Sequence, residues 1–275
     1  MQIAKTHRVA GGELSYAMHE SAATGTQMRL SVFTPAGKGP FPYLIWLSGL
    51  TCTEDNFTTK AGAYAAAAKH GVAIVAPDTS PRGESVADDP AYDLGQGASF
   101  YVDATQTPWA PHFKMESYVV RDLIEAVETS FPLAPRRSIF GHSMGGHGAL
   151  TLAMKHPHLF KSISAFSPIS SPTRCPWGEK AFTAYLGPNR DAWRVHDAAL
   201  LIEAGKAALF DKILIDQGLA DPFLANELKP ELLEEAARKA GQNVSLRRHE
   251  GYDHSYFFIA TFVSEHVAFH AARLA

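Results

Sequence analysis

The sequence predicts a single α/β domain over residues 1–275, with a mostly parallel central sheet, a leading antiparallel hairpin and helices on both faces. Two observations predict this fold class. Short, continuous apolar runs recur along the chain and alternate with stretches of helical periodicity, which is typical of parallel strands buried on both faces. Before the first of these runs, apolar and polar residues alternate with a period of two, which is typical of a hairpin.

The expected strands are therefore of two kinds. The alternating residues of the hairpin flank a turn over 22–25, and they are Leu14, Tyr16 and Met18 before it and Met28, Leu30 and Val32 after it. The continuous apolar runs predict strands over 42–47, 72–76, 138–140, 162–166, 212–215 and 244–248.

The segments between these strands predict helices over 56–70, 116–129, 144–156, 222–240 and 255–274. Strands that alternate with helices imply βαβ units with right-handed crossovers, and the leading hairpin fits an α/β-hydrolase fold. Two irregular segments, 79–113 and 167–190, follow predicted strands and are expected to be long loops. They should lie at the carboxyl edge of the sheet, where open α/β folds bind ligands.

Composition excludes several functional classes. Hydrophobic residues make up 46% of the chain and charged residues 19%, which is an ordinary globular balance. The net charge of -3 gives no reason to expect nucleic acid or an anionic membrane as a partner. The N-terminus has no apolar core of a secretory signal. We therefore expect a cytoplasmic protein in which Cys52 and Cys175 are reduced thiols.

The segment 141–145 (GHSMG) matches the G-x-S-x-G pattern, with Ser143 at its centre. It follows a predicted strand and precedes a predicted helix, which is the context of a nucleophile elbow. The flanking glycines allow the strained turn that exposes the serine. We expect Ser143 to be the nucleophile of a serine hydrolase; a chance glycine-rich turn between a strand and a helix is the alternative.

A base and an acid follow in the chain order that this fold uses, which is serine, then carboxylate, then histidine. His254 lies between the last predicted strand and the last helix, where a loop can bring an imidazole over the elbow. Asp221 follows a strand end and could hold the histidine tautomer, or simply cap the next helix. Asp216 and His249 are rivals, but both are expected within or at the end of a strand.

Two backbone N–H groups are expected to form the oxyanion hole. One belongs to Met144, the residue after the nucleophile, and the other to the loop after the strand at 42–47. We expect Leu50 to be the donor from that loop.

Six blocks of sequence together resemble the S-formylglutathione hydrolases, also called the esterase D family, over nearly the whole chain. The blocks are SGLTCTEDNF (48–57), GASFYVDAT (97–105), GHSMGGHGAL (141–150), CPWGEKAF (175–182), DQGLADPFL (216–224) and GYDHSYFFIATF (251–262). The resemblance implies hydrolysis of S-formylglutathione to formate and glutathione, in formaldehyde detoxification, by a cytoplasmic and often dimeric enzyme without a cofactor. It carries the catalytic roles to Ser143, Asp221 and His254.

Four further residues are candidates for contact with the substrate. Cys52 adjoins the expected oxyanion hole and is more plausible as a wall that thiol reagents would block than as a second nucleophile. His142 lies inside the motif. Trp177 could line the acyl or the thiol side and Lys180 could meet a glutathione carboxylate, although loop packing and a solvated charge explain them equally well.

No metal site is expected. His266 and His270 have the i, i+4 spacing of metal ligands on a helix, but no glutamate follows His266 and no third ligand is evident. Two other functions remain as alternatives: a broad short-chain carboxylesterase on the same scaffold, and a hydrolase fold that has become a non-catalytic binding module.

Overall fold

One nine-stranded sheet runs through the structure, a computed structural model that describes residues 1–275. The strand order is β1-β2-β3-β5-β4-β6-β7-β8-β9. The pairs up to β3–β5 are antiparallel, and all pairs from β5 to β9 are parallel. The strands are β1 (Gln2–Val9), β2 (Gly12–Ser21), β3 (Thr26–Thr34), β4 (Phe41–Leu47), β5 (Ala73–Pro77), β6 (Leu133–His142), β7 (Ile163–Phe166), β8 (Ile213–Gly218) and β9 (Val244–His249). The predicted fold class is confirmed.

The expected hairpin is formed by β2 and β3, which pair from Glu13 opposite Thr34 to Ser21 opposite Thr26. The strand β1, which pairs with β2 and forms the edge of the sheet, was not predicted from the sequence. Nearly all of β1 is exposed to solvent. A strand that buries so little has no apolar pattern by which it could be recognised.

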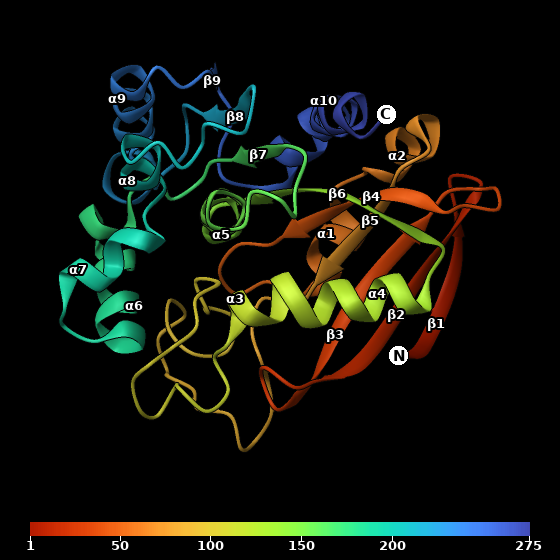
Figure 1. The fold of residues 1–275 in the computed structure, drawn as a ribbon, viewed down its shortest axis with the longest axis horizontal. Coiled ribbons are helices and arrows are strands. Elements are labelled where there is room, and N and C mark those ends of the chain that lie inside the picture. Colours follow the sequence, from red (N-terminus) through yellow and green to blue (C-terminus); the bar gives the residue numbers. More distant parts are fainter.

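The central strands are buried on both faces, which explains their continuous apolar runs. Along β4, Tyr43, Ile45 and Leu47 pack into one core, whereas Leu44 and Trp46 pack into the other. The first core is closed by the helices from 115 to 130 and by those that begin at 144, 176, 198 and 230, and the second by the helices that begin at 54, 64 and 256. Figure 1 shows α2 and α10 on one side of the sheet and α4 on the opposite side.

The main helices are α1 (Glu54–Lys60), α2 (Tyr64–His70), α3 (Met115–Ser117), α4 (Ile124–Ser130), α5 (Met144–Lys155), α6 (Pro176–Leu186), α7 (Arg190–Trp193), α8 (Ala198–Glu203), α9 (Pro230–Ala240) and α10 (Tyr256–Leu274). The helices predicted over 144–156 and 255–274 are confirmed. The one predicted over 116–129 is also helical, with a π-helical turn (Tyr118–Leu123) joining α3 to α4.

Three predictions of secondary structure were wrong in detail. The helix expected over 56–70 is interrupted between α1 and α2, where Gly62 has a φ of +68°. The helix expected over 222–240 is a π-helical turn followed by α9, and it is interrupted at Lys229, which is left-handed and stands before Pro230, where a right-handed helical residue is disfavoured. The segment 167–190, expected to be a loop, contains α6, in which Pro176 occupies a first-turn position where proline is tolerated.

The other expected loop, 79–113, is irregular throughout and precedes α3. It is fastened to the loop after β4, because Thr51 N–H donates to the Gly97 carbonyl at 2.9 Å. The Ser80 hydroxyl accepts a hydrogen bond of 2.8 Å from Gly97 N–H. The carboxyl edge of the sheet is therefore covered by loops that hold one another in place. None of the helices is long and apolar enough to cross a lipid bilayer.

Candidate active site

Ser143 occupies a sharp turn between β6 and α5, with φ of 57° and ψ of -119°. Such a conformation costs a non-glycine residue about 1–3 kcal/mol, so the surrounding structure must enforce it. Ser143 N–H donates to the Phe166 carbonyl at 3.0 Å. A Cβ atom on Gly145 would stand 2.0 Å from the Leu47 carbonyl oxygen, and one on Gly141 2.3 Å from the Gly145 oxygen. The glycines of the motif are therefore required by close backbone packing.

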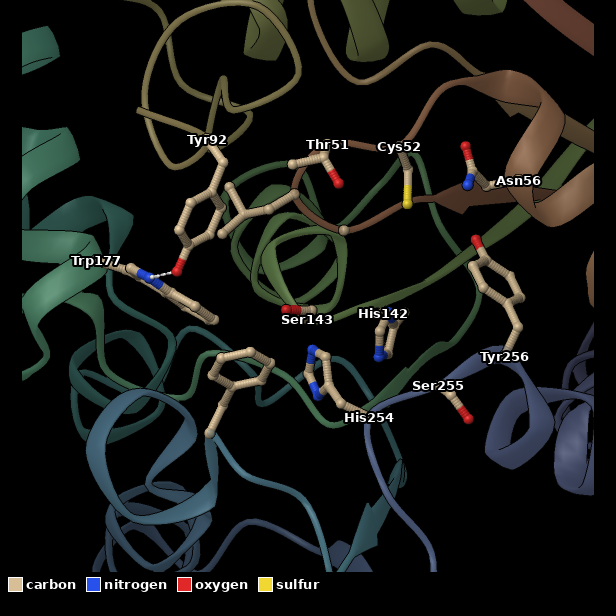
Figure 2. Close-up of a pocket in the computed structure, with 13 residues that line it drawn as sticks. Thr51, Cys52, Asn56, Tyr92, His142, Ser143, Trp177, His254, Ser255 and Tyr256 are labelled. Atoms are coloured by element: carbon tan, nitrogen blue, oxygen red, sulfur yellow. Dashed lines mark hydrogen bonds between the residues drawn. The ribbon is translucent and has the colours of Figure 1, made fainter. Parts of the chain in front are cut away.

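Ser143 opens into a cavity of about 270 Å³. The cavity is lined by Gly49, Leu50, Thr51, Cys52, Asn56, Tyr92, His142, Ser143, Trp177, Phe223, His254, Ser255 and Tyr256. Figure 2 shows Tyr92 and Trp177 on one side of Ser143, and Cys52, Asn56 and Tyr256 on the other. The cavity therefore has an aromatic end and a more polar end, with the serine between them.

His254 and Asp221 form a hydrogen-bonded pair beside Ser143. Nδ1 of His254 lies 2.5 Å from Oδ2 of Asp221, whose side chain is fully buried. The other carboxylate oxygen of Asp221 accepts from the Phe223 N–H at 2.9 Å. The Ser143 hydroxyl makes no hydrogen bond to another side chain, and catalytic hydrogen bonds of this kind often tighten only when substrate binds.

The rival residues lie elsewhere. Asp216 points away from the cavity, and its carboxylate binds Arg247 at 2.5 Å and His266 at 3.2 Å. Burial alone would raise the pKa of Asp216, but the hydrogen bonds from His266 and Arg247 hold it well below its usual range. His249 lies against Phe262 and 3.2 Å from Asp216. Neither rival lines the cavity.

Two backbone N–H groups near Ser143, those of Leu50 in the cavity wall and of Met144 directly after the serine, are without a backbone acceptor. In the loop after β4, Thr51 N–H donates to Gly97 and Cys52 N–H to Gly49, whereas Leu50 N–H has no partner. Met144 begins α5, and the first N–H groups of a helix have no intrahelical acceptor. Both residues were predicted to form the oxyanion hole, and that role stays a prediction.

His142 lines the cavity with its ring buried and its ring centroid 4.3 Å from that of His254. Neither of its ring nitrogens has a hydrogen-bond partner. Burial, aided by the neighbouring charge of His254, holds the pKa of His142 well below its usual range. His142 is therefore a neutral wall of the site at physiological pH.

The other three candidate contact residues differ in position. Cys52 lines the cavity as a free thiol, and burial raises its pKa, which disfavours the thiolate. Trp177 lines the aromatic end, and its Nε1 donates to the Tyr92 hydroxyl at 3.1 Å. Lys180 does not line the cavity, and its ammonium pairs with Asp93.

Several lining residues were missed by the sequence analysis. Four of them lie inside the sequence blocks that resemble the S-formylglutathione hydrolases: Asn56, Phe223, Ser255 and Tyr256. Their position in those blocks was the one sequence feature that could have indicated a place in the site. Tyr92 comes from the irregular segment 79–113, where no pattern distinguishes it from its neighbours.

His266 and His270 on α10 pack against the face of the sheet and do not line the cavity. His266 is hydrogen-bonded to Ser164 at 2.8 Å, and His270 is bonded to Ser162 and Ser164, both at 2.7 Å. Both rings are fully buried. Their i, i+4 spacing is explained by this polar network between α10 and β7.

The parallel sheet with its antiparallel start, the serine at a strained strand-to-helix turn and the Asp–His pair beside it define the α/β-hydrolase class. Residues 21–269 match the model of the Esterase family ("Putative esterase"). The chain belongs to this family, and to the S-formylglutathione hydrolases within it.

Two relatives support this assignment over the full length of the chain. An S-formylglutathione hydrolase of Paracoccus denitrificans is 51% identical over 272 residues, which cover 98% of this chain and 96% of that one. The solved S-formylglutathione hydrolase of Agrobacterium tumefaciens is 44% identical, with a TM-score of 0.97 and full coverage of both chains. A fluorophosphonate-binding serine hydrolase of Staphylococcus aureus, 20% identical with a TM-score of 0.72 over 94% of this chain and 98% of that one, shares the fold.

Proposed function

We propose that the chain is a serine thioesterase that hydrolyses S-formylglutathione to formate and glutathione through a formyl ester on Ser143. The observation that carries the proposal is the buried Asp221–His254 pair in the same cavity as Ser143. Full-length relatives with this activity in their names support the choice of substrate.

In the acylation step, His254 takes the Ser143 proton as the serine oxygen attacks the formyl carbon. Asp221 accepts the Nδ1–H of His254, which fixes the tautomer and stabilises the imidazolium that forms. The oxyanion is held by the N–H groups of Leu50 and Met144, and losing one such donor typically costs about 3 kcal/mol. The C–S bond then breaks, and the glutathione sulfur leaves as a thiolate that can take the proton from His254.

In the deacylation step, His254 removes a proton from water, which attacks the formyl ester of Ser143. The second tetrahedral intermediate collapses, the serine oxygen recovers the proton from His254, and formate leaves. Every step uses side chains and backbone groups of the chain itself, and we propose that no cofactor takes part.

The small cavity supports a short acyl group. Its volume of about 270 Å³ is at the low end for ligand pockets, and its aromatic end is reinforced by the hydrogen bond between Trp177 and Tyr92. We propose that a formyl group, which has no side chain, is accepted more readily than longer acyl groups.

The test compares kcat/KM for S-formylglutathione with kcat/KM for S-acetylglutathione, which has the same leaving group and an acyl group one carbon longer. An extra carbon in a fitted pocket is worth about 1–3 kcal/mol, so we expect a preference of about 10- to 200-fold for the formyl thioester. Comparable efficiency on both substrates would instead favour a broad short-chain carboxylesterase.

We further propose that the enzyme works in the cytoplasm. Its two thiols are unpaired, and Cys52 stands in the cavity itself, where oxidation would obstruct the substrate. A homodimer remains a prediction of the family resemblance, and sedimentation of the purified chain would measure it.

A further inference from the structure

The polar end of the cavity continues outward along α1. Asn56 lines the cavity, and Lys60 follows one helical turn later in the last turn of α1. Residues four apart share a helix face, with a rise of about 6 Å between them. The Lys60 ammonium lies 5.9 Å from the ring centroid of Tyr256, which also lines the cavity. An exposed cation therefore stands at the outer rim of the polar end.

Lys60 is the uncommitted cation at this rim. Arg82, which lies behind Cys52, is bound to the Asp78 carboxylate and to the Cys52 carbonyl. At the aromatic end, Lys180 pairs with Asp93. Lys60 has no carboxylate within ion-pairing distance.

Neither the exposed aspartate of α1 nor the aspartate of the His254 loop forms an ion pair with Lys60, and both accept hydrogen bonds from other groups. The Asp55 carboxylate on α1 accepts from the Tyr16 hydroxyl at 2.6 Å. Asp253, which precedes His254, accepts from the hydroxyl and the N–H of Ser255 at 2.6 and 3.0 Å. The positive charge of Lys60 is therefore available to an anionic group of a ligand bound at the polar end.

We propose that Lys60 binds a carboxylate of the glutathione moiety, while the peptide lies along Asn56 between that carboxylate and the sulfur at Ser143. The inference rests on the proposed function. Glutathione is a tripeptide with two carboxylates and a span of about 10 Å, so it must extend beyond a cavity of this size. The polar end offers it the NH₂ group of Asn56, whose amide oxygen already accepts from Thr53 N–H at 2.9 Å, and then a cation. The aromatic end offers Trp177 and an ion pair that is already formed.

The proposal is tested by changing the charge at Lys60 and comparing two formyl thioesters. The first substrate is S-formylglutathione, and the second is S-formyl-N-acetylcysteamine, which has the same reacting group and no carboxylate. An exposed charge pair is worth up to about 1 kcal/mol, so Lys60→Ala should raise KM for S-formylglutathione about three- to fivefold. Lys60→Glu should raise it about tenfold or more, because repulsion replaces attraction. Neither variant should change kcat/KM for the neutral thioester.

The matched control is Lys69→Glu, which makes the same charge change at an exposed lysine near the end of α2. It should leave both substrates unaffected. Added salt should reduce kcat/KM of the native enzyme for S-formylglutathione and should have less effect on Lys60→Ala, because salt screens exposed charges.

The result that would overturn the inference is an equal loss on both thioesters, or no loss, in Lys60→Glu. A KM increase confined to Lys180→Glu would also overturn it, and would assign the carboxylate to the aromatic end. These outcomes presuppose that the native enzyme prefers S-formylglutathione over S-acetylglutathione. If it does not, the proposed function fails first, and the two failures can be told apart.

Discussion

At the scale of single residues, the two aspartates of the segment from β8 onward have opposite surroundings. Asp221 faces His254 at the cavity, and Asp216 faces Arg247 and His266 behind the sheet. Both are buried carboxylates with well-placed donors, so burial alone does not distinguish a catalytic acid from a structural one. The hydrogen-bonding partner of each carboxylate distinguishes the two, because only Asp221 binds a histidine that lies beside Ser143.

We therefore expect Asp221→Asn and Asp216→Asn to have different effects. Asp221→Asn should lower kcat by about 10⁴-fold with little change in KM, because an amide in place of the carboxylate no longer holds the tautomer that His254 needs. Asp216→Asn should destabilise the fold by about 3–5 kcal/mol, because it removes the buried negative charge that Arg247 and His266 face.

Steady-state kinetics and urea unfolding of both variants measure the two effects. The kcat of folded Asp216→Asn should stay within about threefold of the native value, because Asp216 does not line the cavity. A threefold change corresponds to less than about 1 kcal/mol. A large loss of kcat in Asp216→Asn, with Asp221→Asn active, would reverse the assignment of the acid.

The sequence predicted Ser143, Asp221 and His254 because each lies at the carboxyl end of a strand or in the loop after it, in a chain order that the fold restricts. The rest of the cavity lining was harder to predict. Tyr92 and Asn56 are brought there by loop packing and helix orientation, which depend on contacts distant in sequence. Lys180 was named because of its sequence block, but its side chain is taken up by Asp93.

At the scale of secondary-structure elements, Glu116 links α3 to the end of α5. Its carboxylate binds Lys155 and His156, and His196 lies 4.0 Å away. Burial alone would raise the pKa of Glu116, but the hydrogen bonds from His156 and Lys155 lower it from 4.5 to about 2. The cluster joins three segments that are far apart in the chain.

This shift predicts a loss of stability in acid. Between pH 4.5 and about 2, the unfolded chain takes up a proton at Glu116 that the folded chain does not. The contribution of Glu116 is therefore fully present above pH 4.5 and is lost as the pH falls through this window. Glu116→Gln should be less stable than the native chain at pH 7, and its unfolding free energy should change less steeply between pH 4.5 and 2.

Urea unfolding at a series of pH values measures both slopes. Glu84→Gln is a matched control, since Glu84 is exposed and has no ion-pair partner. Parallel pH profiles for the native chain and Glu116→Gln would show that this cluster does not contribute to acid stability.

Strands were predicted better than helices for a physical reason. Burial on both faces produces a continuous apolar run that is hard to mistake, as in β4 and β5. A helix, in contrast, can be interrupted by the backbone conformation of a single residue. Lys229 before Pro230 is left-handed, although the segment around it keeps a helical pattern of apolar residues. The amphipathic pattern continues across the break and hides it.

At the scale of the whole molecule, one sheet carries a separate core on each face, and all the loops of the cavity gather at its carboxyl edge. The loop after β4, the elbow after β6, the Asp221 loop after β8 and the His254 loop after β9 meet there, although they are far apart in sequence. This convergence follows from parallel strand order, and so the sequence could predict that Ser143, Asp221 and His254 would lie at the same edge of the sheet. The edge strand β1 could not be predicted from the sequence, because it contributes almost nothing to either core.

The central claim is that Ser143 is a nucleophile activated by this convergence. The most direct measurement is labelling of the native chain with a fluorophosphonate, followed by peptide mapping by mass spectrometry. We predict one phosphonyl group per chain, on Ser143, and no labelling of a folded Ser143→Ala variant. Absence of label on the native chain, or label that maps to another residue and persists in Ser143→Ala, would contradict the account.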